Sequence, residues 1–196
     1  MDPAFPVYIK IEKGGLIKYE YDKDEGKLII DRVMPASHPY PYAYGFFPST
    51  LGSDGDELDA LIIRNSNGIK NDTTYNAYII GALVMEDEHG MDEKVLCVLG
   101  EDYGRMGDID ILSEDIKKTI ETFFSTYKLN IPGKWSKTYG FIGKQKVYDL
   151  YIEALIRYSA ATWNLDSIHW RHPLEIAWRT SSSSLWTCNN GRVQSQ

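Results

Sequence analysis

Four carboxylates crowd into six consecutive residues, 54–59, which read Asp-Gly-Asp-Glu-Leu-Asp. Two carboxylates about 4 Å apart repel each other by roughly 4 kcal/mol at an effective dielectric constant near 20. Divalent cations that take oxygen ligands offset such repulsion best. A solvated turn between two strands is the ordinary interpretation of an acidic hexapeptide, so this segment alone does not separate a turn from a metal site.

A second acidic segment, residues 86–93, reads Glu-Asp-Glu-His-Gly-Met-Asp-Glu. Both acidic segments follow or precede predicted strands, so an antiparallel barrel could bring them to one rim. The expected ion is Mg²⁺, which takes few carboxylates, keeps water ligands and prefers phosphate as a co-ligand. Zinc is not expected, because the four histidines and two cysteines form no recognisable ligand set. Residues 54–59 also fail the EF-hand pattern.

A polyanionic substrate would need fixed positive charges and neutral hydrogen-bond donors as well. The basic candidates are Lys18, Arg32, Lys94, Lys128 and Lys134, and the phenol donors are Tyr40, Tyr44 and Tyr127. Taken singly, each lysine is more simply a solvated surface charge. Only the complete set, together with the two acidic segments, indicates an anion site.

The totals describe one domain, or one domain with a tail, in a chain of 196 residues with a net charge of −7. That charge argues against a general nucleic-acid binder, whose phosphate contacts need a basic face. We expect no signal peptide and no membrane span. Cys97 and Cys188 lie far apart, so we expect no disulfide framework, Cys97 as a buried small hydrophobe, and a cytoplasmic location.

Alternating patterns predict the elements that position these residues. Predicted strands cover residues 7–12, 16–21, 27–33, 58–64, 75–85 and 94–99. The first three are joined by short turns, which favours an antiparallel meander and therefore a barrel or a sandwich. The aromatic run 38–48 contains too many prolines for a central strand.

Two helices are predicted late in the chain. Apolar residues follow a helical period from Ser113 to Lys128, and a second stripe runs from Val147 to Tyr158. Residues 133–140 are expected to form a loop or a short strand. The pattern then changes, so we expect a domain over 1–160 and a C-terminal tail over 161–196. This tail is disordered, a lineage-specific extension, or sequence foreign to the original gene, and we expect no functional role for it.

The hexapeptide fits the Asp-x-Asp-(Pro/Glu)-hydrophobic-Asp motif of the family I soluble inorganic pyrophosphatases. Further blocks resemble those of the family, in the same order: Lys18-Tyr19-Glu20, Asp31-Arg32, Tyr40-Pro41, Tyr44-Gly45, Asp87-Glu88, Asp92-x-Lys94, Tyr127-Lys128 and Gly133-Lys134-Trp135. The resemblance covers about residues 7–155. The hexapeptide alone is moderately specific, whereas the ordered series leaves little room for chance.

What the resemblance implies is a mainly β (α+β) fold, a five-stranded OB-like closed barrel with two packed α-helices. The implied reaction is the hydrolysis of inorganic pyrophosphate to two phosphates by Mg²⁺-activated water. The chain would then be an inorganic diphosphatase, a Mg²⁺-dependent phosphoanhydride hydrolase with three or four Mg²⁺ ions. Two metal ions that share one water lower its pKa, and further cations neutralise the phosphates.

Carried over residue by residue, the resemblance implies that Asp56 is the general base. Asp54, Asp59 and Asp92 resemble ligands of the two metal ions that activate water. Asp87 and Asp92 resemble ligands of a metal ion that arrives with the substrate.

The remaining assignments follow the same resemblance. The residues that resemble phosphate-binding positions are Lys18, Arg32, Tyr44, Tyr127 and Lys128. The supporting residues are Glu20, Tyr40, Glu88, Lys94 and Lys134. Glu57 is expected to lie outside the chemistry.

Two positions depart from the family pattern. Lys10 stands where the family usually has a glutamate, and Glu12 stands at the proline of the same Glu-Ile-Pro pattern. Glu12 shares the strand parity of Lys10, so it could substitute for that glutamate from a shifted register. Ala43 replaces a common asparagine. We expect the chain to stay active despite these changes, and metal affinity is the property that they could alter.

Two rival interpretations remain beside a pyrophosphatase. One is a catalytically silent relative that binds metal or phosphate, which the departure at Lys10 makes conceivable. The other is an acidic, cation-binding structural domain. The expected partners are pyrophosphate and further copies of the chain, with a hexamer favoured and a dimer as the alternative, and neither nucleic acid nor a membrane.

Overall fold

The computed structural model describes residues 2–63 and 68–179, with side chains described as far as residue 163. The chain divides into two units, Met1–Ser159 and Ala160–Gln196. The first unit contains the strands, two of the helices and the beginning of a third helix. Every site residue named above lies in it.

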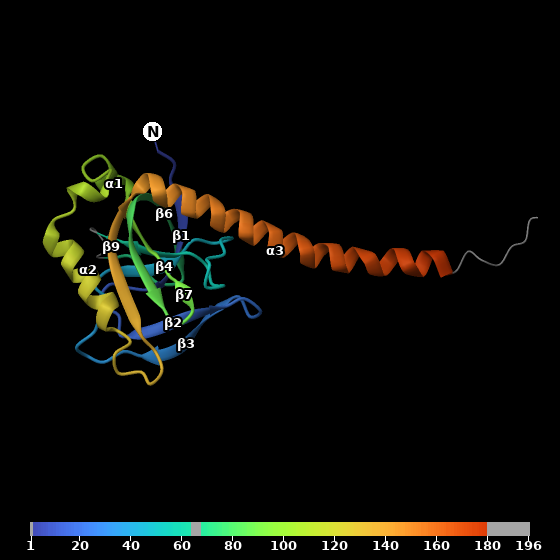
Figure 1. The fold of residues 1–196 in the computed structure, drawn as a ribbon, viewed down its shortest axis with the longest axis horizontal. Helices are drawn as coiled ribbons and strands as arrows, with labels where there is room; N and C mark the ends of the chain where they lie inside the picture. Colours follow the sequence, from blue (N-terminus) through green and yellow to red (C-terminus); the bar gives the residue numbers. More distant parts are fainter. Residues whose placement is uncertain (1, 64–67, 180–196) are drawn as a thin grey trace, which may run out of the picture. The chain divides into compact units, whose positions relative to one another are not determined.

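A ring of strands forms the centre of the first unit (Figure 1). Within the described residues, the five strands of the ring are β1 (Phe5–Ile11), β4 (Ala43–Phe46), β5 (Asp59–Ile62), β8 (Lys94–Leu99) and β6 (Thr73–Asp87). They pair in that order, and β6 pairs back to β1, which closes the ring. The β5–β8 pair is parallel and the other pairs are antiparallel. The expected five-stranded OB-like barrel is thereby confirmed.

Further strands lie outside the ring. β7 (Gly90–Met91) and β9 (Ser136–Gly143) both pair with β6. β2 (Ile17–Asp22) and β3 (Lys27–Val33) form a separate antiparallel hairpin. The segment 133–140, expected to be a loop or a short strand, therefore supplies most of β9.

Two helices pack on the sheet, as expected, and they cover its opposite faces. α2 (Glu114–Thr126) packs beside β9, and the first turns of α3 (Lys144–Arg179) pack on the other core cluster (Figure 1). Alternation along the strands separates the two clusters: Leu61 and Leu96 pack toward α2, whereas Ile62 and Cys97 pack toward α3. Cys97 is fully buried, as expected, and burial raises the pKa of its thiol.

Two short helical segments were not anticipated, α1 (Gly100–Tyr103) and η1 (Ile109–Ile111). α3 also continues beyond the stripe that ends at Tyr158. Glycine and proline, the residues that usually end a helix, are absent from 159–172, so no sequence signal marked an end there. No helix in the described part of the chain is long and apolar enough to cross a membrane.

The aromatic segment 38–48 corrects one expectation. It contains β4, a fully buried central strand that pairs with both β1 and β5. The prolines of this segment flank residues 43–46 rather than interrupt them, so each ladder keeps its donors. Gly45 makes the pairing with β1 possible, because a Cβ there would lie 1.9 Å from the carbonyl oxygen of Tyr8.

We predict that Gly45→Ala destabilises the protein by about 3 kcal/mol or more, because a central strand must move to admit the methyl group. Urea unfolding followed by circular dichroism measures the loss. Gly104→Ala is the matched control, because nothing lies within 4 Å of the Cβ position at Gly104 and its φ is −61°. Equal stability of the two variants would contradict the placement of β4.

Candidate active site

A buried lysine stands at the centre of the acidic residues. The parallel pairing of β5 with β8 sets Asp59, the first residue of β5, beside Lys94, the first residue of β8. Lys94 Nζ donates to Asp59 Oδ2 at 2.6 Å and also to Asp92 Oδ1. The Tyr44 hydroxyl, from β4, donates to the same oxygen of Asp59 at 2.5 Å. The Lys94 side chain is only 2% exposed, so this contact joins both acidic segments below the surface.

The carboxylates around Lys94 carry more negative charge than one ammonium neutralises. Burial raises the pKa of Asp59, but Lys94 and then Lys10 outweigh it, and the net shift is downward. Burial raises the pKa of Asp92, and Asp59 and Asp54 add to that rise against Lys94. Burial, Asp59 and Asp56 also raise the pKa of Asp54. A further cation would relieve this repulsion.

The turn between residues 54 and 59 separates its carboxylates by role. Gly55 has a φ of +96°, and the amide of Asp56 donates to Asp54 Oδ1 at 3.2 Å. The Asp56 side chain is exposed, and no hydrogen bond or ion pair within the described residues engages its carboxylate. Glu57 instead pairs with Lys23 at 2.7 Å. Asp56 is therefore left open to a reactant, and Glu57 is bound to the β2–β3 turn.

A second lysine gathers the carboxylates at the end of β6. Lys128, which follows α2, donates to Asp87 Oδ2 at 2.5 Å and to Glu88 Oε2 at 3.1 Å. Lys134 lies 3.5 Å from Glu88 Oε1. Burial raises the pKa of Glu88, but its own backbone amide and Lys128 outweigh burial and lower it to about 2.

The β2–β3 hairpin supplies a third group. Lys18 donates to Glu20 and, at 3.0 Å, to Asp31. Its neighbour across the hairpin, Arg32, has two buried nitrogen atoms, Nε and Nη2, without a hydrogen-bond partner within the described residues. Buried guanidinium donors are costly to leave unpaired. An anion is the natural partner for them.

Aromatic rings form a wall between these groups. The ring centroids of Tyr40 and Tyr44 lie 5.2 Å apart, and Phe123 lies 4.9 Å from Tyr40 and 5.7 Å from Tyr127. Burial raises the pKa of all three tyrosines. Their hydroxyls therefore stay protonated at neutral pH and are available as donors.

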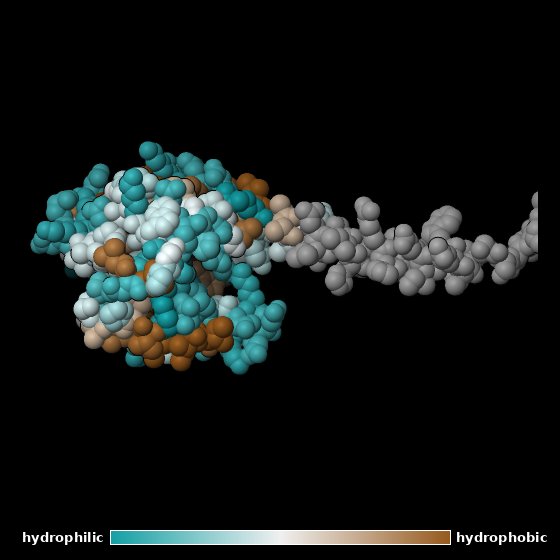
Figure 2. All heavy atoms as spheres, turned by 60° about the horizontal axis from the view of Figure 1, so that its bottom comes forward, coloured by the Kyte–Doolittle hydropathy of each residue, from teal (hydrophilic) through white to brown (hydrophobic). Residues whose placement is uncertain are grey.

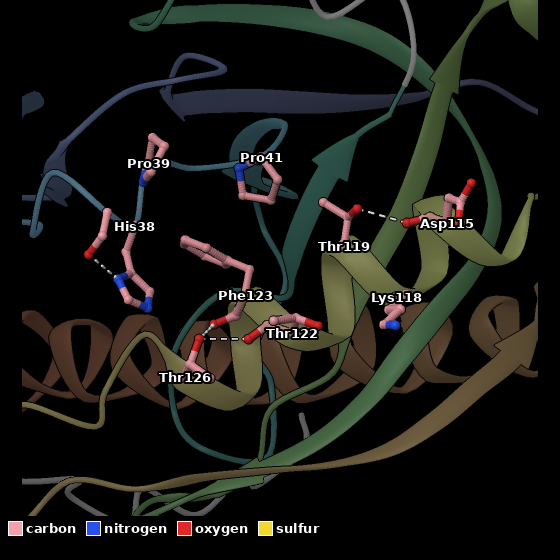
Figure 3. A pocket seen from close by; sticks show the side chains of 10 residues that line it. His38, Pro39, Pro41, Asp115, Lys118, Thr119, Thr122, Phe123 and Thr126 are labelled. Atoms are coloured by element: carbon pink, nitrogen blue, oxygen red, sulfur yellow. Dashed lines mark hydrogen bonds between the residues drawn. The ribbon is translucent and has the colours of Figure 1, made fainter.

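Two pockets adjoin this wall. A groove of about 730 Å³ lies between residues 37–41 and α2, and Figure 3 shows His38 and the prolines facing Phe123 and the threonines of the helix. It contains none of the predicted metal ligands. A smaller pocket of about 170 Å³ is lined by Arg32 and Tyr127, two of the predicted phosphate-binding residues.

At position 10 the sequence departs from the family pattern, and the structure shows which residue Lys10 contacts. Lys10 Nζ lies 2.8 Å from Glu20 Oε2. The register between β1 and β4 shifts between Ile9 and Ile11, which indicates a bulge at Lys10. Lys10 is therefore buried together with both of its neighbours. A bulge of this kind re-aims a side chain and leaves no signal in the alternation. The substitution suggested for Glu12 is wrong: Glu12 lies past the end of β1 and pairs with Lys70 at 3.3 Å.

Comparison with known proteins identifies the family. The inorganic pyrophosphatase family profile matches residues 7–159. The inorganic pyrophosphatase of Helicobacter pylori is 41% identical over 156 residues, which cover 78% of this chain and 90% of that protein. The chain belongs to the family I soluble inorganic pyrophosphatases. Members of this family are hydrolases that convert pyrophosphate to phosphate.

Solved pyrophosphatases confirm the fold. The structure of the Helicobacter pylori enzyme has a TM-score of 0.76 and 39% identity, covering 80% of this chain and 94% of that one. The Thermus thermophilus enzyme has a TM-score of 0.75 and 36% identity, covering 80% of this chain and 92% of that one.

Lysines hold the carboxylates that this family would offer to metal ions. Among residues 2–63 and 68–163, no three carboxylate, imidazole or thiol groups converge closely enough to hold an ion as they stand. The donor set nevertheless suits a hard divalent cation: carboxylate oxygens are in surplus, and Asp59 adds to the rise that burial causes in the pKa of Asp54 and of Asp92. A metal ion bound by Asp59 or Asp92 would have to compete with Lys94 for their oxygens.

We predict that Lys94→Met destabilises the metal-free protein by about 3–5 kcal/mol, because two buried carboxylates lose their cation. Urea unfolding in the presence of EDTA measures this loss. The control is Lys117→Met, which removes an ion pair with the exposed Glu114 and should cost about 0.5 kcal/mol or less. If both variants lost the same stability, the buried ion pair would not organise the site.

Proposed function

We propose that the chain hydrolyses inorganic pyrophosphate to two phosphates by attack of Mg²⁺-activated water at the cluster around Lys94 and Lys128. The observation that carries this proposal is that the site contains two complementary sets of groups. One set is a surplus of carboxylates that could bind cations. The other is the Arg32 guanidinium, which has two buried donors without a partner among the described residues. A polyanion that arrives with divalent cations satisfies both sets at once.

Mg²⁺ is the proposed cofactor, with three or four ions. Asp54, Asp59 and Asp92 would hold two of them, and Asp87 with Asp92 would hold one that accompanies the substrate. When bound, these ions lower the pKa of their water ligands and neutralise phosphate charge. The carboxylates must exchange their lysine partners for the ions, which frees ammonium groups for phosphate.

The protein's own side chains have three tasks in this proposal. Asp56 accepts the proton of the attacking water as the water oxygen bonds to one phosphorus and the bridging P–O bond breaks. Arg32 and Tyr127 bind phosphate oxygens from the small pocket that they line. Lys128 and Lys18 neutralise the charge that develops on the leaving phosphate.

The remaining residues position these groups. Tyr44 orients Asp59 through the hydrogen bond from its hydroxyl. Glu20 and Glu88 hold the lysines that bind phosphate, and Lys134 borders Glu88. Tyr40 packs between Tyr44 and Phe123 and maintains the aromatic wall.

We predict that Asp56→Asn lowers the rate of phosphate release by about 10²- to 10⁴-fold, because the general base is lost while its shape is kept. Asp59→Ala should also lose most of the activity, because a metal ligand is removed. Glu57→Gln is the control from the same turn and should retain nearly full activity, since Glu57 pairs with Lys23. Near-wild-type turnover by Asp59→Ala would refute the assignment.

We also propose that the chain forms a homo-oligomer, with a hexamer favoured over a dimer. The outer face of β3 is apolar and exposed, with Ile30 62% and Val33 70% exposed. Figure 2 shows apolar side chains gathered along the lower edge of the domain in that view. A contiguous apolar surface of this kind is typical of an interface.

For the oligomer, light scattering should give a mass that is a multiple of the 22.4 kDa chain. The double variant Ile30→Glu, Val33→Glu should lower that mass, because buried carboxylates oppose association. Ile111→Glu, at an exposed apolar residue outside the hairpin, is the control and should leave the mass unchanged. A wild-type mass of one chain would refute the oligomer.

The last proposals concern the tail and the location. We propose that residues 1–160 form the catalytic domain, that residues 161–196 have no part in hydrolysis, and that the protein is cytoplasmic. The family match, which ends at residue 159, supports the domain limit. Neither nucleic acid nor a membrane is a proposed partner.

A chain that ends at residue 160 should keep its melting temperature and, within about twofold, its rate of phosphate release, because the removed residues lie outside the domain. Differential scanning calorimetry and a phosphate assay measure the two properties. Loss of folding in the truncated chain, beside a protease-resistant full-length protein, would contradict this limit.

A further inference from the structure

Lys10 is a buried cation for which the proposed chemistry has no task. It is 8% exposed, lies inside the barrel wall on β1, and its Nζ is 2.8 Å from Glu20 Oε2. The same nitrogen lies 5.4 Å from the ring centroid of Tyr44 and 5.6 Å from that of Phe46. Burying an ammonium group is costly unless its charge is compensated.

Glu20 does not need Lys10 as a partner. Its other oxygen, Oε1, already accepts a hydrogen bond from Lys18. Lys18 also pairs with Asp31 at 3.0 Å, so Glu20 and Asp31 together keep Lys18 compensated and Glu20 keeps a cation if the Lys10 charge is removed.

Tyr44 connects Lys10 with Asp59. The ammonium groups of Lys10 and Lys94 lie 5.4 Å and 5.9 Å from the centroid of the Tyr44 ring. The Tyr44 hydroxyl is bonded to the Asp59 carboxylate. Lys10 makes no hydrogen bond to Asp59 among the described residues, so its influence is through charge alone.

We propose that Lys10 is an internal cation that sets the metal affinity of the site, weakening the binding of the divalent ion held by Asp59. The inference rests on the proposed function, because it takes Asp59 as a metal ligand. Lys10 touches neither substrate nor reacting atoms and is a tuning residue rather than a catalytic one. Its consequence is a higher Mg²⁺ concentration for half-saturation than the carboxylates alone would set.

The fixed position of Lys10 makes the effect unavoidable. Lys94 can be displaced from Asp59 when a metal ion binds, because it is a competing ligand. Lys10 is bonded to Glu20 and enclosed by Tyr44 and Phe46, so it stays near the ion and repels it. A unit charge that faces a divalent ion across several ångströms changes affinity by about tenfold even when water screens the pair.

A purely structural role makes a different prediction, and a neutral isostere separates the two. Lys10→Met keeps the volume of the side chain and leaves Glu20 paired with Lys18, so no buried charge is orphaned. If Lys10 serves stability alone, this variant lowers the melting temperature and leaves the metal affinity unchanged. If Lys10 tunes the metal site, the affinity rises.

The test is isothermal titration calorimetry of the substrate-free, full-length protein with Mg²⁺, on wild type, Lys10→Met and Lys10→Glu. We expect the dissociation constant for Mg²⁺ to fall about tenfold in Lys10→Met and further in Lys10→Glu. The control is Lys70→Met, which removes an exposed lysine that pairs with Glu12. This variant should leave the dissociation constant for Mg²⁺ unchanged.

An unchanged or larger dissociation constant in a folded Lys10→Met protein would overturn the inference, as would a wild-type protein that binds no Mg²⁺. If Lys10→Glu does not fold, Lys10→Met alone decides. Calorimetry measures Mg²⁺ binding and does not depend on turnover. The role of Lys10 and the proposed hydrolysis can therefore be refuted independently of each other. Wild-type protein that binds Mg²⁺ but releases no phosphate from pyrophosphate would refute the proposed function and leave the role of Lys10 standing.

Discussion

The ion pair of Lys94 with Asp59 and Asp92 is the constraint on which the rest of the site depends. Each acidic segment alone would expel its carboxylates to solvent, because unpaired charges are costly to bury. Lys94 holds one carboxylate from each segment beneath the surface. The parallel β5–β8 pairing aligns the lysine with the first of them. The barrel thus keeps a set of anionic ligands assembled in the absence of metal ions.

The same arrangement is repeated around the cluster. Lys128 holds Asp87 and Glu88 at the end of β6, and Lys18 holds Glu20 and Asp31 on the hairpin. In each case carboxylates hold a lysine in place. In the proposed reaction, the binding of pyrophosphate with its divalent cations would exchange some of these ion pairs for new ones, so that charge would stay compensated. Arg32 keeps two buried donors without a hydrogen-bond partner among the described residues.

Motif spacing in the sequence singled out charged residues that the fold brings together, such as Asp59, Asp92 and Lys94. Alternation predicted most strands, including all but the ends of β6. It missed β4, since prolines outside residues 43–46 obscured a short buried strand. Alternation also could not predict that Lys10 is buried, because a bulge breaks the two-residue period on which such predictions rest. The assigned roles of individual carboxylates stay predictions.

The most direct test of the account is the rate of phosphate release from pyrophosphate as a function of Mg²⁺ concentration, with tripolyphosphate and a nucleoside triphosphate as comparison substrates. The account predicts rapid release from pyrophosphate that depends on Mg²⁺, is abolished by EDTA and greatly exceeds release from the other two. Absence of release at saturating Mg²⁺, or an equal rate with the nucleoside triphosphate, would contradict it.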